Sequence, residues 1–339
     1  MPASGRANAL AFRYLKPAGR RATQYEELTL HTQWSPKTFA TQGWFSPDSK
    51  GRGVWDESST RLKASDWWGY RDPSQQWFRP YVDLQTKSEQ AIELAIRGAR
   101  RAGLFAGLSR GWARILADYY SAYRFPEYGI FLALCYAQRE ALSDVVGTPL
   151  VFQSLDKVRH SQAIALCMME LEEMIPSFTD QRARPVWMED PVYQPSREYV
   201  ELLLACRDWG EILVAINLAY EPLVAGLITR EFFVRGAAHN GDPVTPVILE
   251  TVAADRERNM AASIELVRFL IADTAANRGV VQDWLSVWEP RALRAAQAFA
   301  PLFDVPERKP IGFDQAAATV AGEYADMIRN LKLQTPTVG

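Results

Sequence analysis

From residue 83 onward, apolar residues recur three and four positions apart over long stretches, which is the period of amphipathic helices. Pro126 predicts a bend or a break inside the second of these stretches, because proline cannot donate the helical hydrogen bond. No alternation of strand and helix and no glycine-rich phosphate loop accompanies the pattern. It predicts an all-α domain over residues 83–339. The predicted helices are Gln85–Arg101, Ser109–Leu142, Thr148–Met174, Ser196–Cys206, Asp208–Ala238, Pro243–Ala275, Val281–Phe299 and Phe313–Leu331.

Residues 1–82 lack this period and form a different kind of segment. Proline, glycine, serine and tryptophan recur there and interrupt both regular periods, so a short strand at Glu26–Thr32 is the regular element predicted. Six of the eleven tryptophans lie in this stretch, whereas a disordered tail would be poor in aromatic residues. We therefore expect an extended, mostly irregular but ordered arm.

Two hypotheses about this arm stay open. It wraps only the chain's own helical bundle, or it also embraces a partner chain, since tryptophan is common both in cores and at the centres of interfaces. On the second hypothesis, the candidate interface residues are Trp44, Trp55, Trp67 and Trp68.

Composition narrows the class of protein. A chain of 339 residues can bury a large core, and its formal net charge of −2 gives no electrostatic reason to expect nucleic acid or an anionic membrane as a partner. No run of 18 uncharged apolar residues predicts a membrane span. Cys135, Cys167 and Cys206 lie in apolar helical stretches without a CxxC motif. We interpret them as buried thiols of a cytoplasmic protein.

The candidate chemistry lies in the middle of the third predicted helix, where residues 154–162 place charges inside an apolar run. In di-iron carboxylate bundles, this part of a helix carries Glu-x-x-His, whose two side chains share one face. Here the sequence is Lys157-x-x-His160. The lysine cannot ligate iron, because an ammonium group has three donors and no acceptor.

The other helices repeat this incomplete pattern. A di-iron bundle needs a Glu from each of two helices and a Glu-x-x-His from each of the other two. Glu127 and Glu221 lie in the second and fifth predicted helices, and the sixth offers Arg256-x-x-Asn259. Lys157, Arg256 and Asn259 thus occupy three of the six ligand positions. The sequence predicts a degenerate site without metal.

Charge pairing gives a physical reason for the cations at the positions where a di-iron site has glutamate. Two carboxylates buried without counter-charges would be costly, so we predict ion pairs of Glu127 with Lys157 and of Glu221 with Arg256. One alternative is that Glu127, His160 and Glu221 still hold a single metal ion, which the adjacent cations disfavour. Another is an ordinary helical protein with a few core charges, which the rarity of unpaired buried Lys and Arg disfavours.

Several stretches spread over most of the chain resemble those of a known family. They are Arg21-Ala22-Thr23-Gln24-Tyr25-Glu26, Thr41-Gln42-Gly43-Trp44, Ser65-Asp66-Trp67-Trp68 with Arg71-Asp72-Pro73, Lys157-Val158-Arg159-His160-Ser161-Gln162, and Asn240-Gly241-Asp242 followed by Thr245-Pro246. The chain resembles the β subunit of the hydroxylase component of soluble bacterial multicomponent di-iron monooxygenases, which oxidise alkenes, aromatics, propane and methane.

The resemblance implies a ferritin-like helical fold and a structural role. In this family the α subunit carries the complete ligand set, and the β subunit has lost it. The implied partners are the di-iron α subunit, a coupling protein and a reductase with NADH, FAD and an iron–sulfur cluster; a small γ subunit stays open. No cofactor is expected in this chain.

The resemblance also gives an expected reaction, which is alkene epoxidation by the assembled enzyme, in the cytoplasm. The alternatives are the β subunit of a propane or aromatic hydroxylase, a stand-alone di-iron or single-metal oxidoreductase, and a free-standing helical binding protein.

Overall fold

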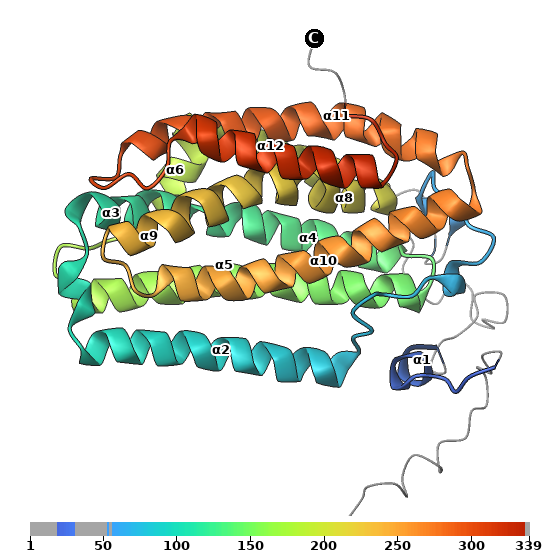
Figure 1. Cartoon of the computed structure of the whole chain (residues 1–339), viewed down its shortest axis with the longest axis horizontal. Helices are drawn as coiled ribbons and strands as arrows, with labels where there is room; N and C mark the ends of the chain where they lie inside the picture. The colour runs from blue at the N-terminus through green and yellow to red at the C-terminus, as the bar shows by residue number, and fades with distance from the viewer. Residues whose placement is uncertain (1–18, 31–52, 54–55, 336–339) are drawn as a thin grey trace, which may run out of the picture.

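The computed structural model of the chain describes residues 19–30, 53 and 56–335, and this part contains helices and no strand. Its long helices run side by side along one axis (Figure 1). Four central elements form the core: α4 (Arg124–Glu140), α5 (Asp144–Met174), η6 (Ile216–Val234) and α10 (Thr245–Asp273). Helix α4 packs along α5, and η6 packs along α10. The fold is thus all-α and ferritin-like, as predicted.

The most buried of the four, η6, continues α8 (Trp209–Ala215) and leads into α9 (Arg235–His239). Its turns are π-helical, with hydrogen bonds from residue i+5 to residue i. Among the described residues, Trp209–His239 is the one helix that is long and apolar enough to cross a membrane, with a hydropathy of 1.8. In the folded chain, 94% of the apolar stretch of this helix is buried. This helix is therefore the centre of the bundle.

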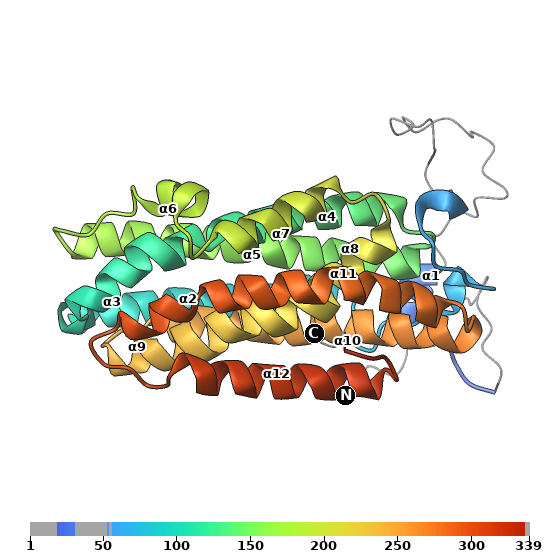
Figure 2. The same ribbon diagram turned by 90° about the horizontal axis from the view of Figure 1, so that it is seen from above.

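Further helices cover the four central ones. Figure 1 shows α2 along one side of the bundle, and Figure 2 shows α12 along another. The described chain also contains α1 (Gln24–Leu30), η2 (Glu57–Ser59), η3 (Trp67–Gly69), α2 (Phe78–Arg101), η4 (Leu104–Gly107), α3 (Arg110–Ile115), η5 (Leu116–Tyr120), α6 (Ala183–Glu189), α7 (Gln194–Ala205), α11 (Asn277–Ala298), η7 (Ala300–Asp304) and α12 (Phe313–Asn330).

Several helices begin or end a few residues from the predicted boundaries, α6 was not predicted, and two differences are larger. Helix α2 begins at Phe78, before Gln85, so it starts inside the stretch that was expected to be the arm. The predicted helix from Ser109 is divided into α3, η5 and α4, and the turn lies at Tyr123. Pro126 then falls in the first turn of α4, where its missing N–H leaves no helical bond unmade. The predicted break therefore occurs three residues before the proline.

The strand predicted at Glu26–Thr32 is wrong, because the described residues 24–30 form helix α1. The helix begins with a capping box, in which two side chains satisfy each other's backbone N–H groups. The N–H of Glu26 donates to Thr23 Oγ1 at 3.2 Å, and the N–H of Thr23 donates to Glu26 Oε2 at 2.9 Å. Residues 31 and 32 lie outside the described residues.

The described end of the arm binds the chain's own bundle. Ser59 Oγ donates to the carbonyl oxygen of Glu140 at 3.1 Å, and Tyr70 Oη donates to that of Ala262 at 2.9 Å. The N–H of Lys63 donates to the side chain of Asn277 at 2.9 Å. Residues 59–70 therefore tie helices from both halves of the bundle together.

The four tryptophans of the interface hypothesis have different positions. Trp67 is buried in this chain's own core, with its ring edge-on to Trp209 at 5.6 Å between centroids. This packing accounts for the burial of Trp67 within the chain, and an interface role for it stays a prediction. Trp68 is half-buried against the core. Trp44 and Trp55 lie outside the described residues. A partner contact through the arm stays a prediction.

The interpretation of the cysteines needs one correction. All three are free thiols. Cys167 is buried in α5 and Cys206 is half-buried, but Cys135 in α4 is exposed. Ala133 and Leu134 are buried on other faces of α4, whereas Leu132, one turn before Cys135, is exposed on the same face as the thiol.

Candidate functional site

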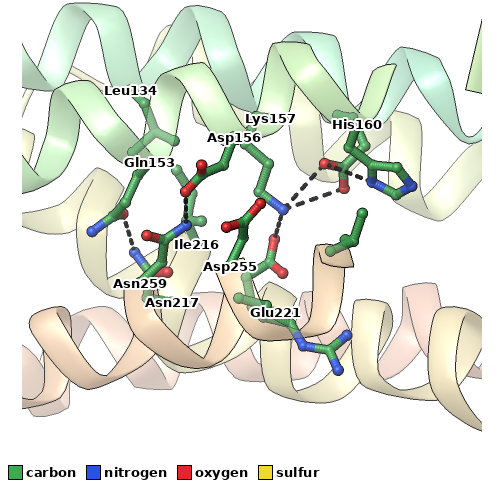
Figure 3. A pocket seen from close by; sticks show the side chains of 13 residues that line it. Leu134, Gln153, Asp156, Lys157, His160, Ile216, Asn217, Glu221, Asp255 and Asn259 are labelled. Carbon is green, nitrogen blue, oxygen red and sulfur yellow. Dashed lines mark hydrogen bonds and ion pairs between the residues drawn. The ribbon is translucent and has the colours of Figure 1, made fainter. Parts of the chain in front are cut away.

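The centre of the bundle holds an ammonium group between two carboxylates. Lys157 Nζ from α5 lies 2.6 Å from Glu221 Oε1 of η6, and 3.3 and 3.2 Å from the two carboxylate oxygens of Glu127 of α4 (Figure 3). Lys157 is only 6% exposed, and the two glutamates are less so. The predicted ion pair of Glu127 and Lys157 is confirmed.

Electrostatics keeps these groups charged despite their burial. Burial acts to raise the pKa of Glu127, but the nearby Lys157 and His160 outweigh it and lower this pKa to about 2. Burial likewise acts to lower the pKa of Lys157, and the two carboxylates outweigh it and raise this pKa. The three side chains therefore form a buried ionic cluster, which is held by mutual attraction in a medium of low dielectric constant.

The second predicted ion pair, of Glu221 with Arg256, is wrong. Glu221 pairs with Lys157, and Arg256 of α10 donates instead to Thr229 Oγ1 at 2.8 Å. Thr229 lies two helical turns beyond Glu221 on the same element, so the long arginine side chain reaches along η6 and away from the carboxylate. One lysine thus serves both glutamates.

His160 lies beside this cluster without a hydrogen-bond partner among the described residues. Its Nδ1 is 3.3 Å from Glu127 Oε2, and its ring lies 5.9 Å from that of Tyr123. A cavity of about 10 Å³ lies among the cluster residues, which is room for about one water molecule.

A second set of charges, which the sequence analysis missed, joins α5 to α10 by crossed ion pairs. Asp156 of α5 accepts from Arg258 of α10 at 2.5 Å, and Asp255 of α10 accepts from Arg159 of α5 at 2.5 Å. The predicted site residue Asn259 also donates to Asp156, at 2.9 Å. Each helix thus pairs its aspartate with the arginine of the other helix, which relates α5 and α10 by an approximate twofold symmetry.

Helix α2 is attached to the same charges. Tyr81 Oη donates to Asp156 at 2.9 Å, and Gln85 Nε2 donates to Asp156 at 3.1 Å and to Asp255 at 2.8 Å. Burial and the neighbouring Asp255 carboxylate raise the pKa of Asp156 to about 6. The sequence held a signal for this network. Asp156-Lys157-Val158-Arg159-His160 and Asp255-Arg256-Glu257-Arg258-Asn259 repeat one pattern of an aspartate followed by an arginine three residues later.

These residues do not fit a metal ion as they stand. Among the residues that the structure describes, no group of three or more His, Cys, Asp or Glu side chains has the arrangement of a metal site. The reason is geometric and electrostatic, because Lys157 Nζ fills the space between the two glutamates and carries the positive charge that they require. The geometry defines a helical bundle of the di-iron carboxylate type whose core is stabilised by an ion pair.

Comparison with known proteins agrees with this class. The sequence profile of the Methane/Phenol/Alkene Hydroxylase family matches residues 44–274. The small subunit of the propane 2-monooxygenase hydroxylase of Mycolicibacterium goodii is 31% identical over 96% of this chain and 90% of its own length. The methane monooxygenase component A beta chain of Methylococcus capsulatus is 29% identical over 86% of this chain and 78% of its own length. The chain therefore belongs to this hydroxylase family, as a β subunit of a multicomponent monooxygenase.

Solved structures show the same fold. A chain of the phenol hydroxylase of Pseudomonas sp. OX1 superposes with a TM-score of 0.80, at 18% identity, over 97% of this chain and all of that chain. A chain of toluene 4-monooxygenase with toluene bound in its resting active site superposes with a TM-score of 0.75, at 24% identity, over 85% of this chain and 98% of that chain.

Proposed function

We propose that this chain is the non-catalytic β subunit that assembles with, and supports, a catalytic di-iron α subunit of a hydrocarbon monooxygenase. The observation that carries this proposal is the position of Lys157, whose ammonium group lies between the two glutamates that a di-iron bundle would use as ligands. An enzyme that activated oxygen at this place would need carboxylates free to bind iron, and here both are held by the lysine.

The relatives support a substrate class for the proposed enzyme. Four relatives with 29–31% identity over 96% of this chain are small subunits of propane 2-monooxygenase hydroxylases. They support oxidation of propane or a similar short alkane by the assembled enzyme in preference to the alkene epoxidation that the sequence analysis expected. An aromatic substrate has less support, because the toluene and phenol relatives are 24–26% identical over smaller parts of the chain.

The remaining parts of the proposal concern the other components. The enzyme would obtain electrons from NADH through a reductase with FAD and an iron–sulfur cluster, and a coupling protein would act on the hydroxylase. The support is that the relatives are named as components of multicomponent systems. A third, small subunit of the hydroxylase is compatible with this arrangement.

Metal analysis of separated subunits tests the proposal. The hydroxylase is purified with its iron, the two chains are separated under mild denaturation, and iron and protein are measured in each fraction. We expect the iron with the α chain and this chain free of it. About two irons per copy of this chain would contradict the proposal, and so would turnover of propane by this chain and the reductase without α.

A further inference from the structure

Three side chains of the kinds that bind transition metals lie around Lys157, because two carboxylates contact its amine and an imidazole lies beside one of these carboxylates. They are Glu127, His160 and Glu221, from α4, α5 and η6, and each is at most 2% exposed. Glu221 Oε2 and both ring nitrogens of His160 make no hydrogen bond within the described residues, and Glu127 Oε2 is shared between Lys157 Nζ at 3.2 Å and His160 Nδ1 at 3.3 Å. Buried polar atoms without such partners are costly. The cluster thus keeps the donor atoms of a cation site, which the ammonium group alone does not saturate.

The spacing of two of these atoms matches that of ligands to one ion. His160 Nδ1 and Glu127 Oε2 are 3.3 Å apart. Two ligands that are each about 2.1 Å from one metal ion, at an angle of about 100°, lie about 3.2 Å from each other. The amine is 2.6 Å from Glu221 and 3.2–3.3 Å from the two oxygens of Glu127, so Glu221 would have to move inward by about 0.5 Å and Glu127 by about 1 Å to bind a metal ion in its place.

The charges favour a single divalent ion. Without the amine, Glu127 and Glu221 would carry two negative charges, which one divalent ion neutralises. Arg256 does not compensate them, because its guanidinium group donates to Thr229. The second ion of a di-iron site lacks its Glu and His ligands here, since Arg256, which has no acceptor, and Asn259 stand at those positions.

We propose that Lys157 blocks a mononuclear transition-metal site. Its ammonium group occupies the place of the ion and excludes divalent metal from the natural chain. Once the amine is removed, Glu127, His160 and Glu221 bind one divalent ion such as Co²⁺ or Zn²⁺. The lysine thereby directs iron to the partner while the hydroxylase is assembled. This inference goes beyond the proposed function, which requires only that the natural chain holds no catalytic iron.

Two variants test the proposal in the assembled hydroxylase. Lys157→Ala removes the charge and leaves room for an ion and a water molecule, and Lys157→Glu places a carboxylate three residues before His160. The probe is Co²⁺, whose visible absorption reports nitrogen and oxygen ligation. We expect each variant to take up about one more Co²⁺ per copy of this chain than the natural assembly does. The temperature at which this chain unfolds should rise by about 5 °C with Co²⁺ and fall again with EDTA.

Matched controls separate a built site from a mere gain of negative charge. Lys157→Met removes the charge but fills the space, so it should take up no additional Co²⁺. Adding His160→Ala to Lys157→Ala should abolish the uptake and the characteristic absorption. These controls leave the carboxylates in place, so metal uptake that persisted in both would show unspecific binding and overturn the proposal.

The remaining outcomes also decide the question. Absence of uptake and of metal-dependent stabilisation in both Lys157→Ala and Lys157→Glu overturns the proposal. So does failure of both variants to fold with Co²⁺ present, because the ion is expected to replace the amine. In these cases the non-catalytic role stands, provided that the natural chain is free of iron. If the natural chain held a metal ion and lost it on Glu221→Gln, the result would contradict both the non-catalytic role and the blocked metal site.

Discussion

At the scale of single residues, Lys157 and Arg256 differ in their expected contributions to stability. Lys157→Met leaves two buried carboxylates without a counter-charge, and breaking such a pair costs about 3–5 kcal/mol of the free energy of unfolding. Arg256→Met loses one hydrogen bond to Thr229 and should cost about 1 kcal/mol. Urea unfolding of the two variants measures the difference. Equal losses would mean that Arg256 shares the neutralisation of the glutamates.

The raised pKa of Asp156 predicts a pH dependence. This pKa is about 6 in the folded chain, against about 3.9 for an unfolded aspartate. Between these values the folded chain holds the proton more tightly, so the contribution of Asp156 to stability falls as the pH rises from about 4 to 6. The groups around it, Arg258, Asn259, Tyr81 and Gln85, all donate to its carboxylate.

The test compares Asp156→Asn with the natural chain by thermal unfolding at several pH values. The stability advantage of the natural chain should be larger near pH 5 than near pH 8, since the asparagine does not ionise. Asp304→Asn is the control, because that carboxylate is exposed and pairs with Lys309 on the surface. An advantage that grows toward about pH 8 would show that Arg258 keeps Asp156 ionised throughout.

Sequence reasoning located the central residues but assigned only some of their contacts. The helical period places Lys157 and His160 on one face, and the template placed Glu127 opposite them. The crossed pairs of Asp156 and Asp255 were missed because each aspartate directly precedes the residue at a predicted ligand position. Neighbouring residues of a helix point about 100° apart, so the two aspartates face α2 and not the centre of the cluster. The partner of Arg256 depended on how far a long side chain extends along η6, and sequence spacing does not determine this.

At the scale of elements, the turn between α9 and α10 depends on Gly241. Its φ is +77°, and a Cβ atom there would lie 2.3 Å from the backbone oxygen of Gly107. Gly241→Ala should therefore cost about 2–4 kcal/mol, because it combines backbone strain with a clash against main chain that cannot turn aside. Gly279→Ala in α11 is the control, since a Cβ there meets nothing within 4 Å. Similar unfolding midpoints for the two variants would show that the turn adapts.

The sequence predicts which long stretches are helical more reliably than it predicts where each helix begins, and the reason is physical. Long amphipathic or apolar helices carry their period over many residues, so α5 and α10 could be located. Helix α1 has seven residues, and its identity depends on the capping box of Thr23 and Glu26 instead of a period. The start of α2 at Phe78 was missed because its first turns are mostly exposed to solvent, and the apolar pattern there is weak.

At the scale of the whole molecule, the open question is how the subunit holds its partner. Residues 59–70 bind the chain's own bundle, and α1 packs on α5, so a partner contact of the arm would have to use surface that these contacts leave free. Three tryptophans, Trp34, Trp44 and Trp55, lie in residues 1–55, and large aromatic side chains give much contact area for few rotatable bonds. Obligate subunit interfaces commonly bury about 2,000–5,000 Å², which an extended arm can reach.

Deleting residues 1–55 tests this role, since the deletion spares residues 59–70, which tie the bundle together, and removes α1 as the one described helix that is lost. We expect a helical body whose circular dichroism per residue is close to that of the full chain, but which no longer elutes with the α subunit in gel filtration after coexpression. Propane or alkene turnover of the mixture should fall together with assembly. Deletion of residues 336–339 is the control for truncation as such and should leave assembly intact. A full-size complex with normal turnover from the chain without residues 1–55 would mean that the helical body alone makes the interface.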